Sequence, residues 1–156
     1  MTEKNITTKI QVYSYSELTE EQKKLVDLAK EATKGSYAPY SQFNVGAAVL
    51  LENGVTIKGA NQENAAFPAG ICAERSAIFN AGANYPGVGI KSIAVTAFTR
   101  GAFVEEPCAP CGVCRQALIE FEKNAGFPME VLMVGNDTIY RLDSACDLLP
   151  LTFKEF

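Results

Sequence analysis

The chain has 156 residues, of which 47% are hydrophobic and 21% charged, as expected for a soluble domain with a substantial core. Its formal net charge of −4 argues against a nucleic-acid-binding surface, because phosphate binding needs clustered Lys and Arg. The sequence contains no histidine, which excludes Ser-His and Cys-His nucleophilic catalysis.

Helical and strand patterns follow one another along the chain. Residues 1–15 form a polar extension whose short alternating patch suits an edge strand. Thr19 and Gln22 form a capping box that opens an amphipathic helix ending near Gly35. The other expected elements are strands over 45–51 and 55–60 joined by a two-residue Asn53-Gly54 turn, a helix from Cys72 to about Ala83, a strand over 93–98, a helix from Cys111, strands over 131–134 and 139–142, and a short helix capped by Ser144.

This order of elements predicts an α/β fold with three layers, α/β/α. The sheet would be mixed and five-stranded, with helices on both faces. Residues 16–156 would form a single catalytic domain, to which residues 1–15 add an N-terminal extension.

Two short segments carry most of the candidate chemistry: Cys72-Ala73-Glu74-Arg75 and Pro110-Cys111-Gly112-Val113-Cys114-Arg115-Gln116. Cys111 and Cys114, at i and i+3, lie on one face of a first helical turn and can both bind one metal ion. Cys72 would supply a third thiolate, which leaves the fourth tetrahedral position of a zinc ion open to water, as in catalytic sites. Glu74 can then move protons to and from that water.

The spacing of Cys72 and Glu74 sets a condition on this site. Residues two apart lie roughly 200° apart around a helix, so the two side chains cannot share one helical face. Cys72 should therefore lie at or just outside the helix start, with Glu74 in the first turn.

Each of these residues also has a plainer interpretation. The cysteines could be buried small side chains or a Cys-x-x-Cys redox pair, Glu74 an exposed glutamate favoured at a helix start, and Arg75 a surface charge. Cys108 precedes Pro110, which denies the turn an N–H, so we expect Cys108 to be a loop cysteine rather than a ligand. We expect Cys146 to pack in the core.

Cys-Ala-Glu-Arg followed by Pro-Cys-Gly-x-Cys-Arg-Gln resembles the zinc-dependent cytidine deaminases, in particular the small homotetrameric type with three cysteine ligands. The resemblance implies a proton carrier, Glu74, beside one Zn²⁺ per chain held by Cys72, Cys111 and Cys114. Three thiolates make zinc a poor Lewis acid, and the resemblance implies that Arg75 bonds to the ligand sulfurs and withdraws negative charge. Arg115 is a weaker candidate for that role.

The same resemblance implies residues that bind a nucleoside. Asn61 and Glu63, in Asn-x-Glu-Asn, would bind the sugar near its 3′-hydroxyl. Phe43 would lie beside the nucleoside, although on its own it could be a plain core residue. The backbone of Ala73 would contact the base.

The C-terminal Leu-Leu-Pro-x-x-Phe segment also resembles the family. It implies a homotetramer in which Phe153, and not Phe156, lies against the base in a neighbouring subunit.

The sequence departs from the family at two places. Phe67 stands where relatives often carry Tyr, so any hydroxyl contact there is lost. Residues 1–15 have no counterpart in the shorter members of the family.

The implied activity is hydrolytic deamination of cytidine and 2′-deoxycytidine to uridine and deoxyuridine, with release of ammonia, in pyrimidine salvage. A related deaminase for a modified nucleoside such as blasticidin S would use the same chemistry. A structural zinc module would need a fourth ligand, which only Cys108 could supply. A dithiol redox protein would need neither Cys72 nor Glu74.

The location follows from weaker signals. No apolar run approaches the length of a membrane span, and the N-terminus lacks a signal-peptide core. Five cysteines, an odd number, favour a reducing compartment over a disulfide framework. We therefore expect a cytoplasmic enzyme with a small-molecule substrate and no nucleic-acid or membrane partner.

Overall fold

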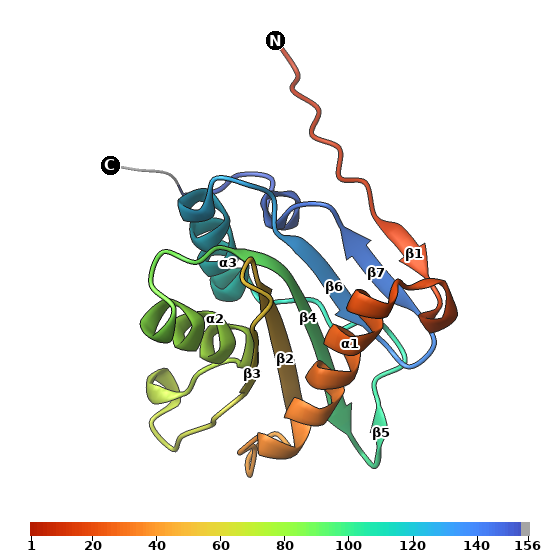
Figure 1. Cartoon of the computed structure of the whole chain (residues 1–156), viewed down its shortest axis with the longest axis vertical. Helices are drawn as coiled ribbons and strands as arrows, with labels where there is room; N and C mark the ends of the chain where they lie inside the picture. Colours follow the sequence, from red (N-terminus) through yellow and green to blue (C-terminus); the bar gives the residue numbers. More distant parts are fainter. Residues whose placement is uncertain (154–156) are drawn as a thin grey trace.

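The structure, a computed structural model, describes residues 1–153 and contains a mixed β-sheet with helices packed on both faces (Figure 1). The α-helices are α1 (Glu20–Ala32), α2 (Ala73–Asn84) and α3 (Gly112–Ala125). The strands are β1 (Gln11–Tyr13), β2 (Asn44–Leu51), β3 (Thr56–Ala60), β4 (Ile90–Thr99), β5 (Ala102–Phe103), β6 (Glu130–Val134) and β7 (Ile139–Leu142). Short 3₁₀ helices are η1 (Tyr15–Glu17), η2 (Thr33–Gly35), η3 (Phe67–Ala69) and η4 (Ala145–Leu148).

The strands of the described chain form a seven-stranded sheet in the order β1-β7-β6-β4-β2-β3, with β5 paired to β4 beside this path. β4 and β6 are parallel, and the other neighbours are antiparallel. The α/β fold and the mixed sheet are confirmed, but the predicted five strands become seven. β1 is the edge strand expected in the N-terminal extension, and it pairs with β7. β5 has only two residues, too few to show an alternating pattern.

α1 covers one face of the sheet, and α2 and α3 cover the other (Figure 1). Successive residues of β2 serve the two layers in turn: Ala48 and Leu50 pack in the α1 layer, and the α2–α3 layer takes Ala47, Val49 and Leu51. Because both faces are covered, β2 is a nearly continuous apolar run rather than an alternating one.

Two glycines allow helices to pack directly against strands. A Cβ atom at Gly46 of β2 would lie 2.2 Å from the carbonyl oxygen of Ala29 in α1. A Cβ atom at Gly59 of β3 would lie 2.4 Å from the carbonyl oxygen of Ala73, the first residue of α2. A side chain at Gly59 would therefore push away the start of α2, which carries the first predicted metal ligand.

The predictions for the start of α1 and for the β2–β3 turn have different outcomes. Thr19 and Gln22 form the expected capping box. The hairpin loop, however, has three residues and not two, because the Leu51 N–H donates to the Val55 carbonyl oxygen and the Gly54 N–H donates to the Leu51 carbonyl oxygen. Gly54 has a φ of 82°, the left-handed conformation that closes such a loop.

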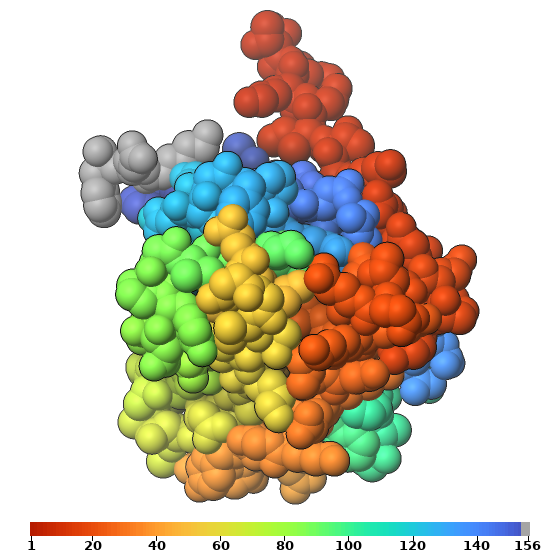
Figure 2. Space-filling view, viewed as in Figure 1, coloured from red at the N-terminus to blue at the C-terminus, as the bar shows by residue number. Residues whose placement is uncertain are grey.

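Residues 1–10 are exposed and extend away from the sheet (Figures 1 and 2). The Thr8 hydroxyl donates a hydrogen bond of 3.2 Å to the carbonyl oxygen of Asp147, so the extension contacts η4. In the part of the chain that the structure describes, no helix is long and apolar enough to cross a membrane.

Candidate active site

Two helix starts bring three thiols together. Cys72 and Cys111 are the N-cap residues of α2 and α3, and Cys114 lies in the first turn of α3. The Sγ atoms of Cys72 and Cys111 are 4.0 Å apart, and those of Cys111 and Cys114 are 3.6 Å apart. All three Sγ atoms lie within 4.8 Å of one another. Cys72 thus lies just outside its helix and Glu74 in the first turn, as the spacing predicts.

The surroundings of the thiols favour a thiolate. The N-terminal ends of two helices present partial positive charge to the cluster. Nη2 of Arg75 donates to Sγ of Cys72 over 3.7 Å. A hydrogen bond with Cys114, supported by the one from Arg75, lowers the pKa of Cys72 to about 5. The same contact and burial raise the pKa of Cys114.

Glu74 is buried beside the thiols, with only 4% of its surface exposed. Burial raises the pKa of its carboxyl above the ordinary value, and the charge of Cys72 acts in the same direction. A carboxyl group whose pKa lies closer to neutral is better suited to exchange protons with a substrate. The plainer interpretation, an exposed glutamate at a helix start, is wrong.

The two arginines of the motifs have different partners. The buried Nε of Arg75 has no hydrogen-bond partner within residues 1–153, and its Nη2 is directed at Cys72. Arg115 donates instead to the backbone, from Nε to the Pro110 carbonyl oxygen (2.8 Å) and from Nη1 to the Leu148 carbonyl oxygen (3.0 Å). Of the two candidates, Arg75 is the one whose guanidinium contacts a thiol.

The other two cysteines lie outside the three-thiol cluster. Burial raises the pKa of the Cys108 thiol to about 12, and the charge of Glu74 adds to this shift, so Cys108 stays a protonated loop cysteine. Cys146 is exposed, and the prediction that it packs in the core is wrong. The short turn of η4 buries Ala145 and Leu148 instead, which leaves Cys146 on the outer side.

A second group of predicted residues lies where β3 ends. Oδ1 of Asn61 accepts hydrogen bonds from the Val45 N–H (2.8 Å) and the Ser36 hydroxyl (2.5 Å). Nδ2 of Asn61 donates to the carbonyl oxygen of Phe43 (2.9 Å). Asn61 therefore holds the backbone on which Phe43 sits, and the Phe43 side chain is partly exposed. The amide nitrogen of Asn61 carries two N–H groups, and the bond to Phe43 uses one of them.

Glu63 holds the neighbouring loop. Its Oε2 accepts hydrogen bonds from the backbone N–H groups of Tyr40 (2.9 Å) and Ser41 (3.2 Å). A hydrogen bond from the Ser41 side chain is the main cause that holds the pKa of the Glu63 carboxyl below its ordinary value, and the two backbone bonds act in the same direction. This side chain is therefore a negative charge at the edge of the predicted sugar-binding segment.

A bridge of three segments joins this second group to the thiols. Gln62 pairs with Ile71 through two backbone hydrogen bonds of 2.9 Å, and Tyr37 pairs with Gln62 on its other side. Ile71 directly precedes Cys72, so the predicted sugar-binding segment lies next to a predicted metal ligand. The sequence does not indicate these pairings, because each one involves a single residue outside any regular strand.

Comparisons with known proteins decide the family. A family model described as the cytidine and deoxycytidylate deaminase zinc-binding region matches residues 19–127. The chain belongs to the cytidine and deoxycytidylate deaminase family.

Similar proteins support this assignment over most of the chain. A cytidine deaminase from Sporosarcina psychrophila is 45% identical over 133 residues, which cover 85% of this chain and 90% of the relative. A cytidine deaminase from Halalkalibacterium halodurans is 44% identical over 96 residues, which cover 62% of this chain and 68% of the relative. The crystal structure of a cytidine deaminase from Burkholderia pseudomallei matches with a TM-score of 0.70 and 41% identity, covering 87% of this chain and 100% of that one.

The donor set of this deaminase suits one zinc ion. Zn–S bonds of about 2.3 Å in a tetrahedron place sulfur atoms about 3.8 Å apart. The 3.6 and 4.0 Å separations found here lie on either side of that value. Three sulfur ligands leave one tetrahedral position for water, as in catalytic zinc sites. A closed structural zinc site is not supported, because the cluster found among residues 1–153 holds no fourth ligand.

The remaining residues singled out in the sequence of this deaminase lie in three separate segments. Ala73 is fully buried at the start of α2. Phe153 is 65% exposed, and its backbone is hydrogen-bonded to Gln116 of α3, a contact that the sequence does not indicate. Phe67, in η3, is 90% exposed. Phe156 lies outside the described residues.

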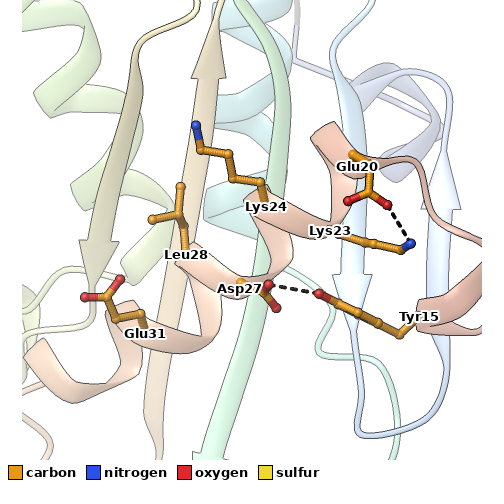
Figure 3. A pocket seen from close by; sticks show the side chains of 7 residues that line it. All are labelled: Tyr15, Glu20, Lys23, Lys24, Asp27, Leu28 and Glu31. Atoms are coloured by element: carbon orange, nitrogen blue, oxygen red, sulfur yellow. Dashed lines mark hydrogen bonds and ion pairs between the residues drawn. The ribbon is translucent and has the colours of Figure 1, made fainter.

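A cavity of about 330 Å³ on the surface of α1 is separate from these groups (Figure 3). Five of its seven lining side chains are charged, and two contacts join lining residues to one another. The Tyr15 hydroxyl donates to Asp27 (2.8 Å), and Lys23 pairs with Glu20 (2.8 Å). No predicted site residue lines this cavity, and we assign it no part in deaminase chemistry.

Proposed function

We propose that the protein catalyses the hydrolytic deamination of cytidine and 2′-deoxycytidine to uridine and deoxyuridine, with release of ammonia, in pyrimidine salvage. The observation that carries the proposal is the cluster of three thiols at two helix starts with Glu74 buried beside it. The relatives named as cytidine deaminases support the choice of substrate.

Glu74 is the proton carrier of the proposed reaction. Bound at the thiols, zinc supplies Lewis-acid chemistry that makes water acidic enough to lose a proton near neutral pH. Glu74 accepts that proton as the water oxygen bonds to C4 of cytosine, and it delivers a proton to N3. It then carries the second water proton to the amino group, which leaves as ammonia when the C4–N bond breaks. Cytidine and water thus give uridine and ammonia without another reactant.

Arg75 compensates for the charge of the thiolates. Three thiolates around Zn²⁺ carry a net charge of about −1, which would weaken its pull on water. The hydrogen bond from Arg75 to Cys72 and the positive ends of α2 and α3 draw electron density from the sulfurs. The role of Arg75 would therefore be to raise the Lewis acidity of the bound metal rather than to act on the substrate.

The second group of residues would bind the nucleoside. Asn61 and Glu63 would contact the sugar, Phe43 would lie beside the nucleoside, and the backbone of Ala73 would contact the base. Glu63 would repel an added phosphate, since like charges at a few ångströms destabilise a complex. We therefore expect cytidine to be a better substrate than its 5′-monophosphate.

The proposed assembly is a cytoplasmic homotetramer whose sites are completed between subunits. Phe153 would reach the base in a neighbouring subunit, and its exposed side chain supports this role. The five cysteines, all free thiols in the structure, suit a reducing compartment.

Incubation of the purified protein with cytidine tests the activity. We expect the ultraviolet spectrum of cytidine to change to that of uridine, with one ammonia released per nucleoside. A chelator should abolish turnover, and added Zn²⁺ should restore it. Cytidine 5′-monophosphate should react at least about tenfold less efficiently in kcat/KM. Turnover of blasticidin S but not of cytidine would instead assign the same chemistry to a modified nucleoside.

A further inference from the structure

The C-terminal segment is tied to α3 at two points. Nη1 of Arg115 donates to the carbonyl oxygen of Leu148 (3.0 Å). Further along, Nε2 of Gln116 donates to the carbonyl oxygen of Phe153 (3.1 Å), and the Phe153 N–H donates to Oε1 of Gln116 (3.0 Å). The amide of Gln116 thus pairs with the backbone of Phe153 as a neighbouring antiparallel strand would.

The position of Gln116 on α3 connects this contact to the metal centre. Gln116 follows Cys114 by two residues, so the two side chains point roughly 200° apart around the helix. Cys114 is fully buried in the thiol cluster, whereas Gln116 is half-buried and faces the C-terminal segment. One helical turn therefore carries a metal ligand on one side and the contact to Phe153 on the other.

We propose that Gln116 is a positioning residue that sets the direction of the Phe153 side chain, an inference that rests on the proposed function of Phe153 at the neighbouring nucleoside site. Bonds to both the N–H and the C=O of one residue restrain the peptide groups on either side of its Cα, and with them the Cα–Cβ direction. Leu151, two residues earlier, is 80% exposed and contributes little packing. Loss of the Gln116 bonds would remove two restraints on Phe153, so more of its ordering would have to accompany substrate binding, which weakens binding.

The first test measures steady-state kinetics with cytidine. Gln116→Met removes both bonds and keeps the length of the side chain, and we expect KM to rise about tenfold, because each neutral hydrogen bond contributes modestly. kcat and zinc content should stay within about twofold of the unchanged protein. Asn124→Met removes an exposed amide from the same helix and is the matched control. It should leave KM, kcat and zinc content unchanged. An unchanged KM in Gln116→Met would overturn the inference.

A double-mutant cycle separates this inference from the proposed function. Gln116→Met should add no further rise in KM to a Phe153→Ala variant, because the ring it positions is gone. If Phe153→Ala raises KM and the Gln116→Met effect adds to it in full, Gln116 acts elsewhere and the inference fails while the shared site stands. If Phe153→Ala leaves KM unchanged, the shared-site proposal and the inference both fail.

A fluorescence measurement tests the same point without turnover. The chain contains no tryptophan, so a Phe153→Trp variant has a single reporter at this position. Adding Gln116→Met to it should lower the fluorescence anisotropy, and adding Asn124→Met should not. If Gln116→Met does not fold, Gln116→Glu replaces it in the test. Gln116→Glu keeps the hydrogen-bond acceptor but loses the donor, so we expect a smaller fall in fluorescence anisotropy. Equal anisotropy in all variants that fold would overturn the inference.

Discussion

At the scale of single residues, the three thiols of the cluster differ in their surroundings. Cys114 is fully buried, Cys111 is exposed, and Cys72 has Arg75 beside it. The low pKa of Cys72, about 5, means that this sulfur is a thiolate at neutral pH and a ready metal ligand. The pKa of the Glu74 carboxyl is shifted in the opposite direction, because burial raises it.

Replacement of Glu74 should separate chemistry from metal binding. Glu74→Gln keeps the shape of the side chain but cannot carry a proton, so we expect kcat to fall by about 10²–10⁴-fold or more. Zinc content and circular dichroism should match those of the unchanged protein. A variant that retained more than about a tenth of the rate would show that another group carries the proton.

Replacement of Cys72 should remove the metal. Cys72→Ala leaves two thiols, so we expect loss of zinc in metal analysis and a lower melting temperature. Binding of structural zinc contributes about 10–16 kcal/mol in small sites, so even partial loss should be visible. Cys146→Ala, an exposed cysteine outside the cluster, is the control and should keep one zinc per chain. Full zinc occupancy in Cys72→Ala would contradict the ligand set.

At the scale of elements, α3 organises more than the metal. Glu122, in its last turns, accepts hydrogen bonds from the Met129 N–H (2.8 Å), the Ala145 N–H (2.7 Å) and the Ser144 hydroxyl (2.6 Å). One carboxylate thus joins α3 to the start of β6 and to η4, from which the C-terminal segment runs to Phe153.

The stability that Glu122 contributes should depend on pH. Burial alone would raise the pKa of Glu122, but the hydrogen bonds that it accepts outweigh burial and hold the pKa below the ordinary value. A lowered folded-state pKa means that the contribution is present above the unfolded pKa, about 4.3, and is lost as the pH falls through the folded pKa. Glu122→Gln should therefore lower the free energy of unfolding at pH 7 by about 2–3 kcal/mol, because hydrogen bonds to charged groups are strong.

Denaturant unfolding at several pH values checks this prediction. The difference between Glu122→Gln and the unchanged protein should shrink as the pH falls below about 4. Glu120→Gln, an exposed change two residues earlier on the same helix, should show a much smaller difference at every pH. A Glu122→Gln difference that stays constant with pH would show that the charge is not the source of the stability.

At the scale of the whole molecule, the proposed site needs two copies of the chain. The metal ligands and Glu74 lie at the starts of α2 and α3, whereas Phe153 lies on the outside of its own α3 and is 65% exposed. An aromatic ring stacked on a base contributes about 1–3 kcal/mol in proteins that bind single-stranded nucleic acid. Phe153→Ala should accordingly raise KM by roughly one to two decades without loss of zinc.

Mixed oligomers test whether the sites are shared. Glu74→Gln chains lack the proton carrier and Phe153→Ala chains lack the ring, so each kind alone has defective sites. After random mixing in a symmetric oligomer, about a quarter of the sites should combine an intact Glu74 with an intact neighbouring Phe153. We expect turnover at low cytidine concentration to rise above the mean of the two separate variants. No rise in a mixture shown to exchange subunits, or full activity of a monomer, would contradict the shared site.

Local patterns were enough to predict much of this protein. The capping box at Thr19, the approximate positions of the main helices and strands, and the placement of Cys72 outside its helix depend on residues a few positions apart. The three-thiol cluster was also predicted, because zinc ligation needs fixed residue types at short spacing on helix starts. The capping box and the helix starts depend on backbone geometry that neighbouring residues determine by themselves. The meeting of Cys72 with Cys111 and Cys114 is a tertiary contact, which the sequence predicts only because one zinc ion needs several thiolates.

Only the tertiary structure decided the features that depend on segments far apart in the chain. The bridge from Tyr37 through Gln62 to Ile71, and the pairing of Gln116 with Phe153, are single-residue contacts without any periodic pattern. The exposure of Cys146 follows from which side of a short turn packs inward, and β5 forms because a two-residue segment meets the end of β4. In each case the stabilising free energy comes from contacts that exist only once the sheet and its helix layers have assembled. The local sequence therefore cannot predict these features.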